Sequence, residues 1–359
     1  MNDLSIKWKD FYKNVFALVV PMALQNLINV GVTAADVVML GKVSEKVLSG
    51  ASLAGQIQYI MVLFLFGLTS GATVLTAQYW GKGDKTAIEK ILALGIRSAV
   101  IITAIFTIAA FTIPASLMRI FTNDPQVITE GVKYLRIVAC SYIIMGITNV
   151  YLYVMRSIER VIVATVVYLA SFLCNVIFNA IFIFGLFGFP ALGIRGAAIA
   201  TLIARIMELV LVCGYAKIYN KDVKFRVHYF LHQDKLLVRD FLVYSLPVVL
   251  NEVMWGLGTS ANTAVLGHMG SSAVAANSVA QVARQLATVV SFGLSSATAI
   301  YLGKTIGERK FDHARAYAKR FIILSVVMGV IGGGLILIAS PVVISFLSLS
   351  ATARYLSLI

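Results

Sequence analysis

Two stretches of this chain repeat each other without a gap: residues 21–41, PMALQNLINVGVTAADVVMLG, and residues 247–267, PVVLNEVMWGLGTSANTAVLG. The two stretches lie 226 residues apart, and the match continues beyond them, where Gly67 corresponds to Gly293 and Gly81 to Gly307. A long internal repeat indicates a protein assembled from similar structural units. We therefore predict two similar bundles within one chain.

Composition places both units in a membrane. The 359 residues are 59% hydrophobic and 13% charged, whereas a soluble domain carries about 25% charged residues. The apolar residues gather in stretches of about 20 or more, the length of helix that crosses roughly 30 Å of hydrocarbon, and the short alternating segments of a membrane β-barrel are absent. We predict an all-α membrane protein with spans at residues 15–40, 52–79, 90–114, 132–155, 161–187, 192–217, 241–267, 274–302 and 316–346, and the start of a tenth near Ala351.

The predicted spans form two lobes joined by a charged segment. Residues 1–216 form an N-lobe with helices 1–6, residues 217–240 form a linker, and residues 241–359 form a C-lobe with helices 7–9 and the start of helix 10. Because six spans separate the two copies, both copies enter the membrane in the same direction, as in the parallel repeats of secondary transporters. The second copy stops where the fourth span of the first begins, so we expect a fragment or a truncated product that lacks about two and a half helices of a full repeat.

The net charge of +14 reports topology rather than nucleic-acid binding. Lys and Arg gather in alternate loops, around residues 7–13, 82–90, 156–160, 217–239 and 304–320. Cytoplasmic loops carry such an excess, which predicts a multi-pass protein of the cell membrane with a cytoplasmic N-terminus and linker. The partners that we expect are the lipid bilayer and small molecules, with no nucleic acid, and we expect a monomer.

The sequence contains no pattern typical of an enzyme or a structural metal site. The three cysteines, Cys140, Cys174 and Cys213, all lie in apolar spans, and the four histidines show no ligand spacing. No Ser/His/Asp, Cys/His or HExxH arrangement is present. We therefore expect no catalytic residues and no cofactor.

Polar residues line particular faces of the predicted spans. In the first span they recur four, four and three residues apart, so they share one face of a helix. The repeat places a comparable face in the seventh span, and a third polar stripe lies in the fifth span, opposite a threonine of the sixth. The residues concerned are Gln25, Asn29, Thr33 and Asp36; Asn251, Trp255, Thr259 and Asn262, with Glu252 beside them; Ser171, Asn175 and Asn179; and Thr201.

Two acidic residues, Asp36 and Glu252, lie deep in predicted spans. A charge at the bilayer centre costs roughly 2.5–3.5 kcal/mol on insertion scales, so a carboxylate there should take up a proton or hold a cation unless a basic group pairs with it. For the amide side chains the alternative is hydrogen bonding between helices. Arg205 and Glu208 are three residues apart, and we expect them to pair or to reach an interface.

The chain resembles the multidrug and toxic compound extrusion (MATE) family of the MOP flippase superfamily along essentially its whole length. No single motif identifies the family, but the order of the motifs together with the duplication is specific for it. The motifs are Pro21 with residues 36–41 (DVVMLG), residues 77–84 (AQYWGKGD), residues 174–179 (CNVIFN) with Phe184-Gly185, residues 196–201 (GAAIAT), residues 246–252 (LPVVLNE) and residues 267–270 (GHMG).

The resemblance implies twelve helices as six plus six around a central cavity, and export of bulky amphipathic or cationic organic compounds in exchange for H⁺ or Na⁺. In the family, an acid in helix 1, polar residues in helix 5 and a threonine in helix 6 hold the cation. Asp36, Asn175, Asn179 and Thr201 occupy these positions, with Asn179 where the family often has aspartate. Glu252 matches the helix 7 glutamate of the NorM-like branch, so Na⁺ could bind at either place.

These observations lead to a hypothesis of alternating access. Asp36 and Glu252 couple cation entry to export, and the remaining polar residues, Gln25, Asn29, Thr33, Asn251, Trp255 and Asn262 among them, contact substrate or ion. The alternatives are a flippase for lipid-linked oligosaccharide or another lipid in the same superfamily, and a truncated membrane protein that does not transport.

Overall fold

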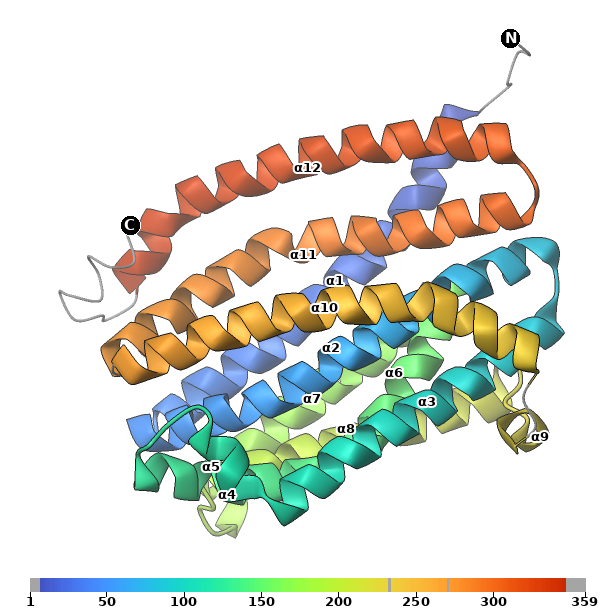
Figure 1. Cartoon of the computed structure of the whole chain (residues 1–359). Coiled ribbons are helices and arrows are strands. Elements are labelled where there is room, and N and C mark those ends of the chain that lie inside the picture. The colour runs from blue at the N-terminus through green and yellow to red at the C-terminus, as the bar shows by residue number, and fades with distance from the viewer. Residues whose placement is uncertain (1–6, 232–233, 270, 347–359) are drawn as a thin grey trace.

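The computed structural model describes residues 7–231, 234–269 and 271–346. Within these ranges the chain is helical, with no strand, and the helices lie side by side as a bundle (Figure 1). The elements are α1 (Trp8–Gly41), α2 (Glu45–Lys82), α3 (Lys85–Thr112), α4 (Pro114–Arg119), α5 (Pro125–Ala139), α6 (Tyr142–Ser157), α7 (Val161–Phe184), η1 (Leu186–Gly188), α8 (Ile194–Ile218), α9 (Val227–Leu231), α10 (Lys235–Met269), α11 (Ser271–Gly307) and α12 (Phe311–Phe346).

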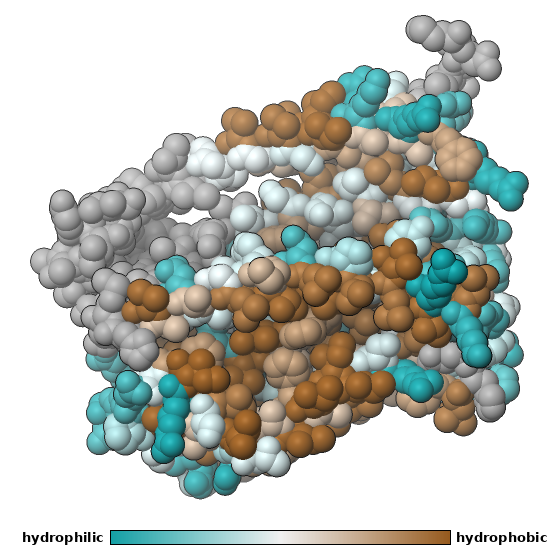
Figure 2. All heavy atoms as spheres, in the orientation of Figure 1, coloured by the Kyte–Doolittle hydropathy of each residue, from teal (hydrophilic) through white to brown (hydrophobic). Residues whose placement is uncertain are grey.

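The predicted all-α membrane class is confirmed. In the described residues, eight helices are long and apolar enough to cross a membrane, or nine if the bent pair α5 and α6 counts as one span. Figure 2 shows apolar side chains over the middle of the bundle and hydrophilic ones toward both ends. The tenth span that we predict near Ala351 lies outside the described residues.

The fourth span is broken, which the sequence did not predict. Helices α5 and α6 meet at an angle of 53°. At the break, Ser141 Oγ donates to the carbonyl of Val138 at 2.6 Å, and Thr107 of α3 donates to the carbonyl of Ala139 at 3.3 Å. Hydroxyl groups that bond to the backbone in this way compete with the regular helix ladder and bend it.

Local signals set where several helices begin and end. Ser44 caps α2 by accepting from the backbone N–H of Val47 at 3.2 Å, and Asp84 caps α3 by accepting from Ala87 N–H at 3.0 Å. Between them, Gly83 ends α2 with a φ of 77°, a left-handed conformation that favours glycine. Residues 81–84 therefore form a tight turn between α2 and α3.

The basic loops meet at one end of the bundle, here called the basic end: the α2–α3 turn, the α6–α7 turn, residues 219–231 with Asp234, and the α11–α12 turn. Ion pairs join these segments. Lys304 of α11 lies 2.8 Å from Glu159 of the α6–α7 turn, and Lys90 of α3 lies 3.5 Å from Asp234. The alternate loops predicted to share one side of the membrane thus lie together.

The first two helices of one repeat, α1 and α2, pack against the first two of the other, α10 and α11. At the closest contacts one helix has a glycine, which has no side chain. A Cβ at Gly67 of α2 would lie 2.5 Å from Cα of Val249 in α10. In the other copy, a Cβ at Gly293 of α11 would lie 3.0 Å from the backbone N of Ala23 in α1. Ala23 and Val249 are themselves 226 residues apart, so one contact is the repeat image of the other.

The same symmetry holds at the basic end. Gly81 packs against the carbonyl of Lys304, and its repeat image Gly307 packs against the carbonyl of Gln78, the image of Lys304. Glycine permits such close helix approach in a membrane, where van der Waals packing drives helix association. The interface between the repeats is therefore pseudo-symmetric and closest toward the basic end.

We predict that Gly67→Ala lowers the midpoint of thermal unfolding in detergent, because the added methyl group would meet the backbone of α10. Overpacking of this kind costs about 1–3 kcal/mol. The matched control is Gly55→Ala in the same helix, where nothing lies within 4 Å of the new Cβ. The control should keep or raise the midpoint, since alanine favours helix over glycine; equal losses in both variants would contradict the packing argument.

Candidate functional site

A chain of polar contacts links α1, α7 and α8 inside the first six spans. Asn179 Nδ2 of α7 donates to Asp36 Oδ1 of α1 at 2.5 Å and to Asn175 Oδ1 at 3.0 Å. Asn175 Nδ2 in turn donates to Thr201 Oγ1 of α8 at 3.4 Å. We call Asp36, Asn175, Asn179, Thr201 and Tyr134 the N-lobe polar cluster.

The two asparagines hold this cluster together because they are one helical turn apart on α7. Asn175 is 2% exposed and Asn179 is fully buried. The carbonyl oxygen Oδ1 of Asn179 has no hydrogen-bond partner, and a buried acceptor without a partner costs about 1–3 kcal/mol. This oxygen therefore leaves the cluster with one unused acceptor, on the side chain that contacts Asp36.

Tyr134 joins the cluster from α5, where its hydroxyl shares a hydrogen bond with Thr201. The polar stripes did not identify this residue, since α5 carries no such stripe around it. The one signal in the sequence is that the pair Tyr134-Leu135 recurs as Tyr355-Leu356, at an offset of 221 because the loop before it is shorter in the second copy. This recurrence supports the repeat but does not indicate a role for the tyrosine.

Arg205 and Glu208 form an ion pair on the face of α8 that carries Thr201. Arg205 Nη1 donates to Glu208 Oε1 at 2.6 Å, and the Glu208 side chain is 2% exposed. Of the two expectations for these residues, pairing or reaching an interface, the structure shows the pairing. Among the described residues, no basic group lies within 4.0 Å of the Asp36 carboxylate, because the Arg205 guanidinium is directed to Glu208.

The predicted stripe on α1 divides between two environments. Gln25 is buried and its Nε2 donates to Thr165 Oγ1 of α7 at 2.7 Å and to the carbonyl of Val161 at 3.0 Å. Asn29 and Thr33 are exposed, and the Thr33 hydroxyl donates to the carbonyl of Asn29 in its own helix. At 100° per residue, Gln25 and Asp36 point within about 20° of each other, whereas Thr33 is rotated by about 80° from Gln25.

The polar residues of α10 form a looser arrangement. Glu252 is half-buried and hydrogen-bonded to the side chain of its neighbour Asn251. Asn251, Trp255 and Asn262 are exposed. Among the residues whose side chains the structure describes, which do not include Arg284, no basic group lies within 4.0 Å of Glu252.

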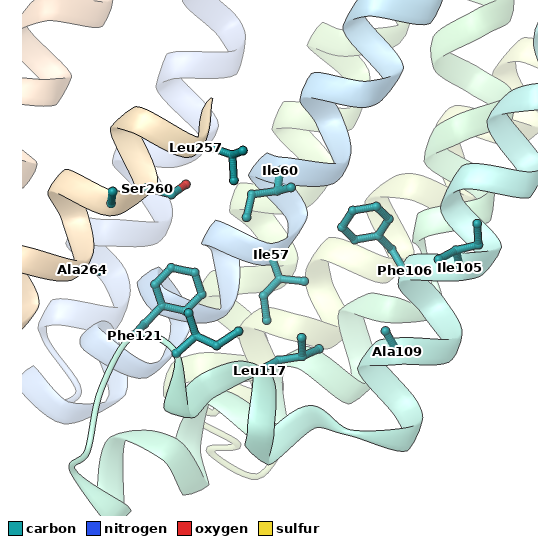
Figure 3. A pocket seen from close by; sticks show the side chains of 12 residues that line it. Ile57, Ile60, Ile105, Phe106, Ala109, Leu117, Phe121, Leu257, Ser260 and Ala264 are labelled. Carbon is teal, nitrogen blue, oxygen red and sulfur yellow. The ribbon is translucent and has the colours of Figure 1, made fainter. Parts of the chain in front are cut away.

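An apolar pocket of about 560 Å³ lies between α2, α3, α4 and α10 (Figure 3). Its walls include Ile57, Phe106, Leu117 and Leu257, and the hydroxyl of Ser260 is its polar side-chain group. That hydroxyl is buried without a hydrogen-bond partner. None of the predicted site residues lines this pocket, which has the size range of small-molecule sites.

The oxygen atoms of the N-lobe polar cluster suit a proton or a hard monovalent cation. The cluster offers one carboxylate, two amide oxygens, two hydroxyl groups and no sulfur or imidazole, and oxygen ligands are those that hard cations prefer. No group of three or more His, Cys, Asp or Glu that could hold a metal ion occurs in the described part of the chain.

Comparison with known proteins gives a consistent family and fold. The MatE family model matches residues 21–181 and 247–359, so its two matches begin at the first residues of the repeated stretches. The "Probable multidrug resistance protein NorM" of Agrobacterium fabrum is 23% identical over 93% of this chain and 72% of its own length. The "Uncharacterized transporter YisQ" of Bacillus subtilis is 22% identical over 84% of this chain and 66% of its own length.

Two solved structures share the fold. A MOP superfamily transporter from Pyrococcus furiosus superimposes with a TM-score of 0.85 at 19% identity, over 95% of this chain and 75% of that protein. A structure described as the outward-facing conformation of a multidrug resistance MATE family transporter has a TM-score of 0.85 at 19% identity, over 96% of this chain and 76% of that protein. The chain therefore spans about two thirds to three quarters of these relatives.

We predict that Asn179→Leu lowers the thermal midpoint, because it leaves the Asp36 carboxylate and the Asn175 amide without their shared donor. Losing such a partner costs about 1–3 kcal/mol for each buried group. The matched control is Asn29→Leu on the exposed part of the α1 stripe, which should leave the midpoint unchanged or raised. A similar decrease in both variants would show that the cluster does not contribute to stability.

Proposed function

The chain belongs to the MatE family of membrane transporters, and we propose that it is a cation-coupled exporter of amphipathic organic compounds. The observation that carries the proposal is the half-buried Asp36 carboxylate within a predicted span, which Asn179 joins to α7 and, through Asn175 and Thr201, to α8. A group in this position can change its charge only by taking up or releasing a proton or a cation. The proposed coupling ion is therefore H⁺ or Na⁺.

Either ion can use atoms already present in the cluster. A proton on Asp36 would allow its hydroxyl to donate to Asn179 Oδ1, the buried oxygen that has no partner. A sodium ion would instead draw together the Asp36 carboxylate, the amide oxygens and the Thr201 hydroxyl. In both cases the amide of Asn179 must reorient, which changes how α1 is attached to α7.

We place the basic end of the bundle in the cytoplasm, because cytoplasmic loops carry the excess of Lys and Arg. With that orientation, the close packing of α2 on α10 at Gly67 and of α11 on α1 at Gly293 closes the cytoplasmic half. Export then requires these contacts to open so that cargo can enter from inside. The proposed cycle is a rocking of the two lobes about this interface.

The membrane potential sets how much work one ion can do. One charge that crosses the membrane releases about 2.3 kcal/mol per 100 mV. A neutral cargo exchanged for one cation gains this energy, whereas a singly charged cationic cargo exchanged one for one gains only the ion gradient. The exposed Asn251 and half-buried Glu252 on α10 add polar groups that favour cationic cargo, and we propose Glu252 as the second coupling residue.

We predict that Asp36→Asn and Glu252→Gln each reduce export of a fluorescent organic cation from proteoliposomes to the rate of empty vesicles, because neither variant can change charge at the coupling position. Proton and sodium gradients are imposed separately, so the gradient that drives the unsubstituted protein identifies the ion. Glu45→Gln, an exposed carboxylate in the first turn of α2, is the control and should transport normally. Full coupled export by Asp36→Asn would reject the proposed site.

A further inference from the structure

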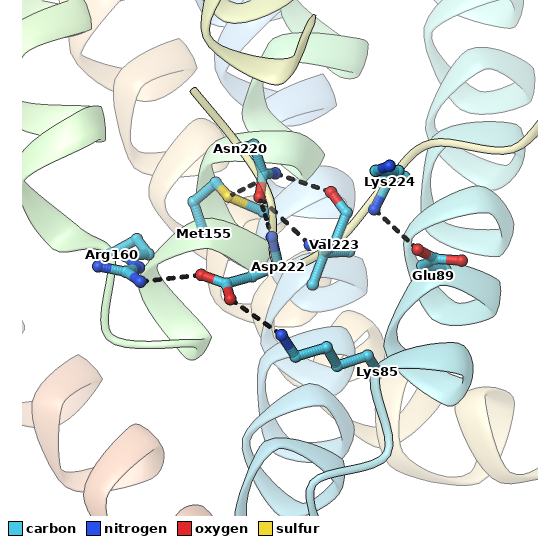
Figure 4. Close-up of polar contacts among 8 residues, drawn as sticks. All are labelled: Lys85, Glu89, Met155, Arg160, Asn220, Asp222, Val223 and Lys224. Carbon is cyan, nitrogen blue, oxygen red and sulfur yellow. Dashed lines mark hydrogen bonds and ion pairs between the residues drawn. The ribbon is translucent and has the colours of Figure 1, made fainter. Parts of the chain in front are cut away.

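The segment between the lobes is firmly attached to the first six helices (Figure 4). Asn220 Nδ2 donates to the carbonyl of Val223 at 2.7 Å and to the Tyr151 hydroxyl at 2.9 Å, while its Oδ1 accepts from the N–H groups of Asp222 and Val223. The Val223 side chain is buried in the main hydrophobic core. Side chains that follow this segment are therefore presented from a defined backbone.

Ion pairs between this segment and the neighbouring helices neutralise three of the four acidic groups in or beside it, whereas Asp240 has no basic residue within 4.0 Å among the described residues. Asp222 lies 3.0 Å from Lys85 Nζ and 2.9 Å from Arg160 Nη2, and hydrogen bonds from these two cations lower the pKa of Asp222. The carboxylate of Glu89 lies 2.7 Å from Arg226. The carboxylate of Asp234 lies 3.5 Å from Lys90, as noted above.

Within the described ranges, four basic side chains that follow α8 in this segment remain without an ion pair. We call Lys221, Lys224, Lys235 and Arg239 the linker basic cluster; all four are exposed, and none has a carboxylate within 4.0 Å among the described residues. The backbone N–H of Lys224 donates to Glu89 at 3.0 Å, and the residue before Lys235 pairs with Lys90, so both lysines lie beside the same turn of α3. The surface therefore holds uncompensated positive charge in one place.

Apolar side chains accompany this charge. Val227, Leu231 and Leu236 are 63%, 65% and 66% exposed. They precede the exposed apolar residues of the membrane span of α10, beginning with Leu242 and Val243. On the opposite side of the same segment, Phe230, Leu237 and Phe241 pack into the core. Exposed apolar groups beside basic ones, at the level where a span leaves the hydrocarbon, are typical of segments that lie in the membrane interface.

We propose that the linker basic cluster, with Val227, Leu231 and Leu236, binds anionic phospholipid at the membrane face of the basic end. The lysines and Arg239 contact the phosphate-bearing headgroups, and the apolar side chains enter the boundary with the acyl chains. Lipid is favoured over a soluble acidic partner because the apolar half of the surface continues into the exposed apolar side of α10, a helix long and apolar enough to cross a membrane. This binding does not depend on transport.

The position of this surface gives lipid a route to influence the lobes. The segment is attached to α3 and to the α6–α7 turn, and it runs directly into α10, which packs on α2. An anionic lipid seated there holds the start of α10 at the membrane surface. The lipid would thus bias the angle at which the second repeat meets the first.

The proposal is tested with the purified chain carrying Leu231→Trp, reconstituted in nanodiscs. Tryptophan quenching by bromine-labelled phosphatidylglycerol is compared with quenching by bromine-labelled phosphatidylcholine, and the signal of the native tryptophans is subtracted. We expect phosphatidylglycerol to be enriched severalfold. Lys235→Gln with Arg239→Gln should remove most of this enrichment, since each basic residue near an anionic surface contributes a factor of about five.

The matched control is Arg315→Gln with Lys319→Gln on α12, which removes two exposed charges at the same spacing and the same end of the bundle. This pair should keep the enrichment, and all variants are first shown to unfold at the same temperature as the parent. Equal quenching by both lipids, or an equal loss in the control, would overturn the proposal. Displacement by soluble glycerol phosphate would also overturn it, because the site would then recognise the phosphate alone.

Discussion

Close approach of backbone to backbone between the two repeats is the constraint on which the structure depends. Gly67 allows α2 to contact Val249 of α10, and Gly293 allows α11 to contact Ala23 of α1. There is little room for a side chain at these places, so the closed interface cannot repack around a larger residue and must open or close as a whole. Because the contacts are pseudo-symmetric, each repeat contributes the equivalent surface to the interface.

This interface places the N-lobe polar cluster where it can affect both lobes. Helix α1 contacts α11 near Ala23 and carries Asp36 about 20 Å further along, at 1.5 Å per residue. Between these points Gln25 joins α1 to α7 through Thr165. Helix α1 therefore belongs both to the cluster and to the interface, which the proposed coupling through Asp36 requires.

The basic residues around the linker that the structure describes fall into two groups, those in ion pairs and those without one. One group forms ion pairs that fix the linker to the first lobe: Lys85 and Arg160 with Asp222, Arg226 with Glu89, and Lys90 with Asp234. The remaining cations face outward beside exposed apolar side chains. Around the linker, the positive-inside pattern of the sequence contains both groups, and the tertiary contacts distinguish them.

The sequence by itself determined the class of protein, the offset of the repeat and the face of α7 that carries Asn175 and Asn179. These follow from composition, from the match between the two halves and from the period of a single helix, and the family resemblance grouped Asp36 and Thr201 with the two asparagines. Only the tertiary structure decided that Asn29 and Thr33 stay outside the cluster, that Tyr134 reaches it from α5, that Arg205 pairs with Glu208, and that the fourth span is broken at Cys140–Ser141. Helical periodicity sets the direction of a side chain about its own axis, but which neighbour that side chain meets depends on how the helices pack, and packing is a property of the whole bundle.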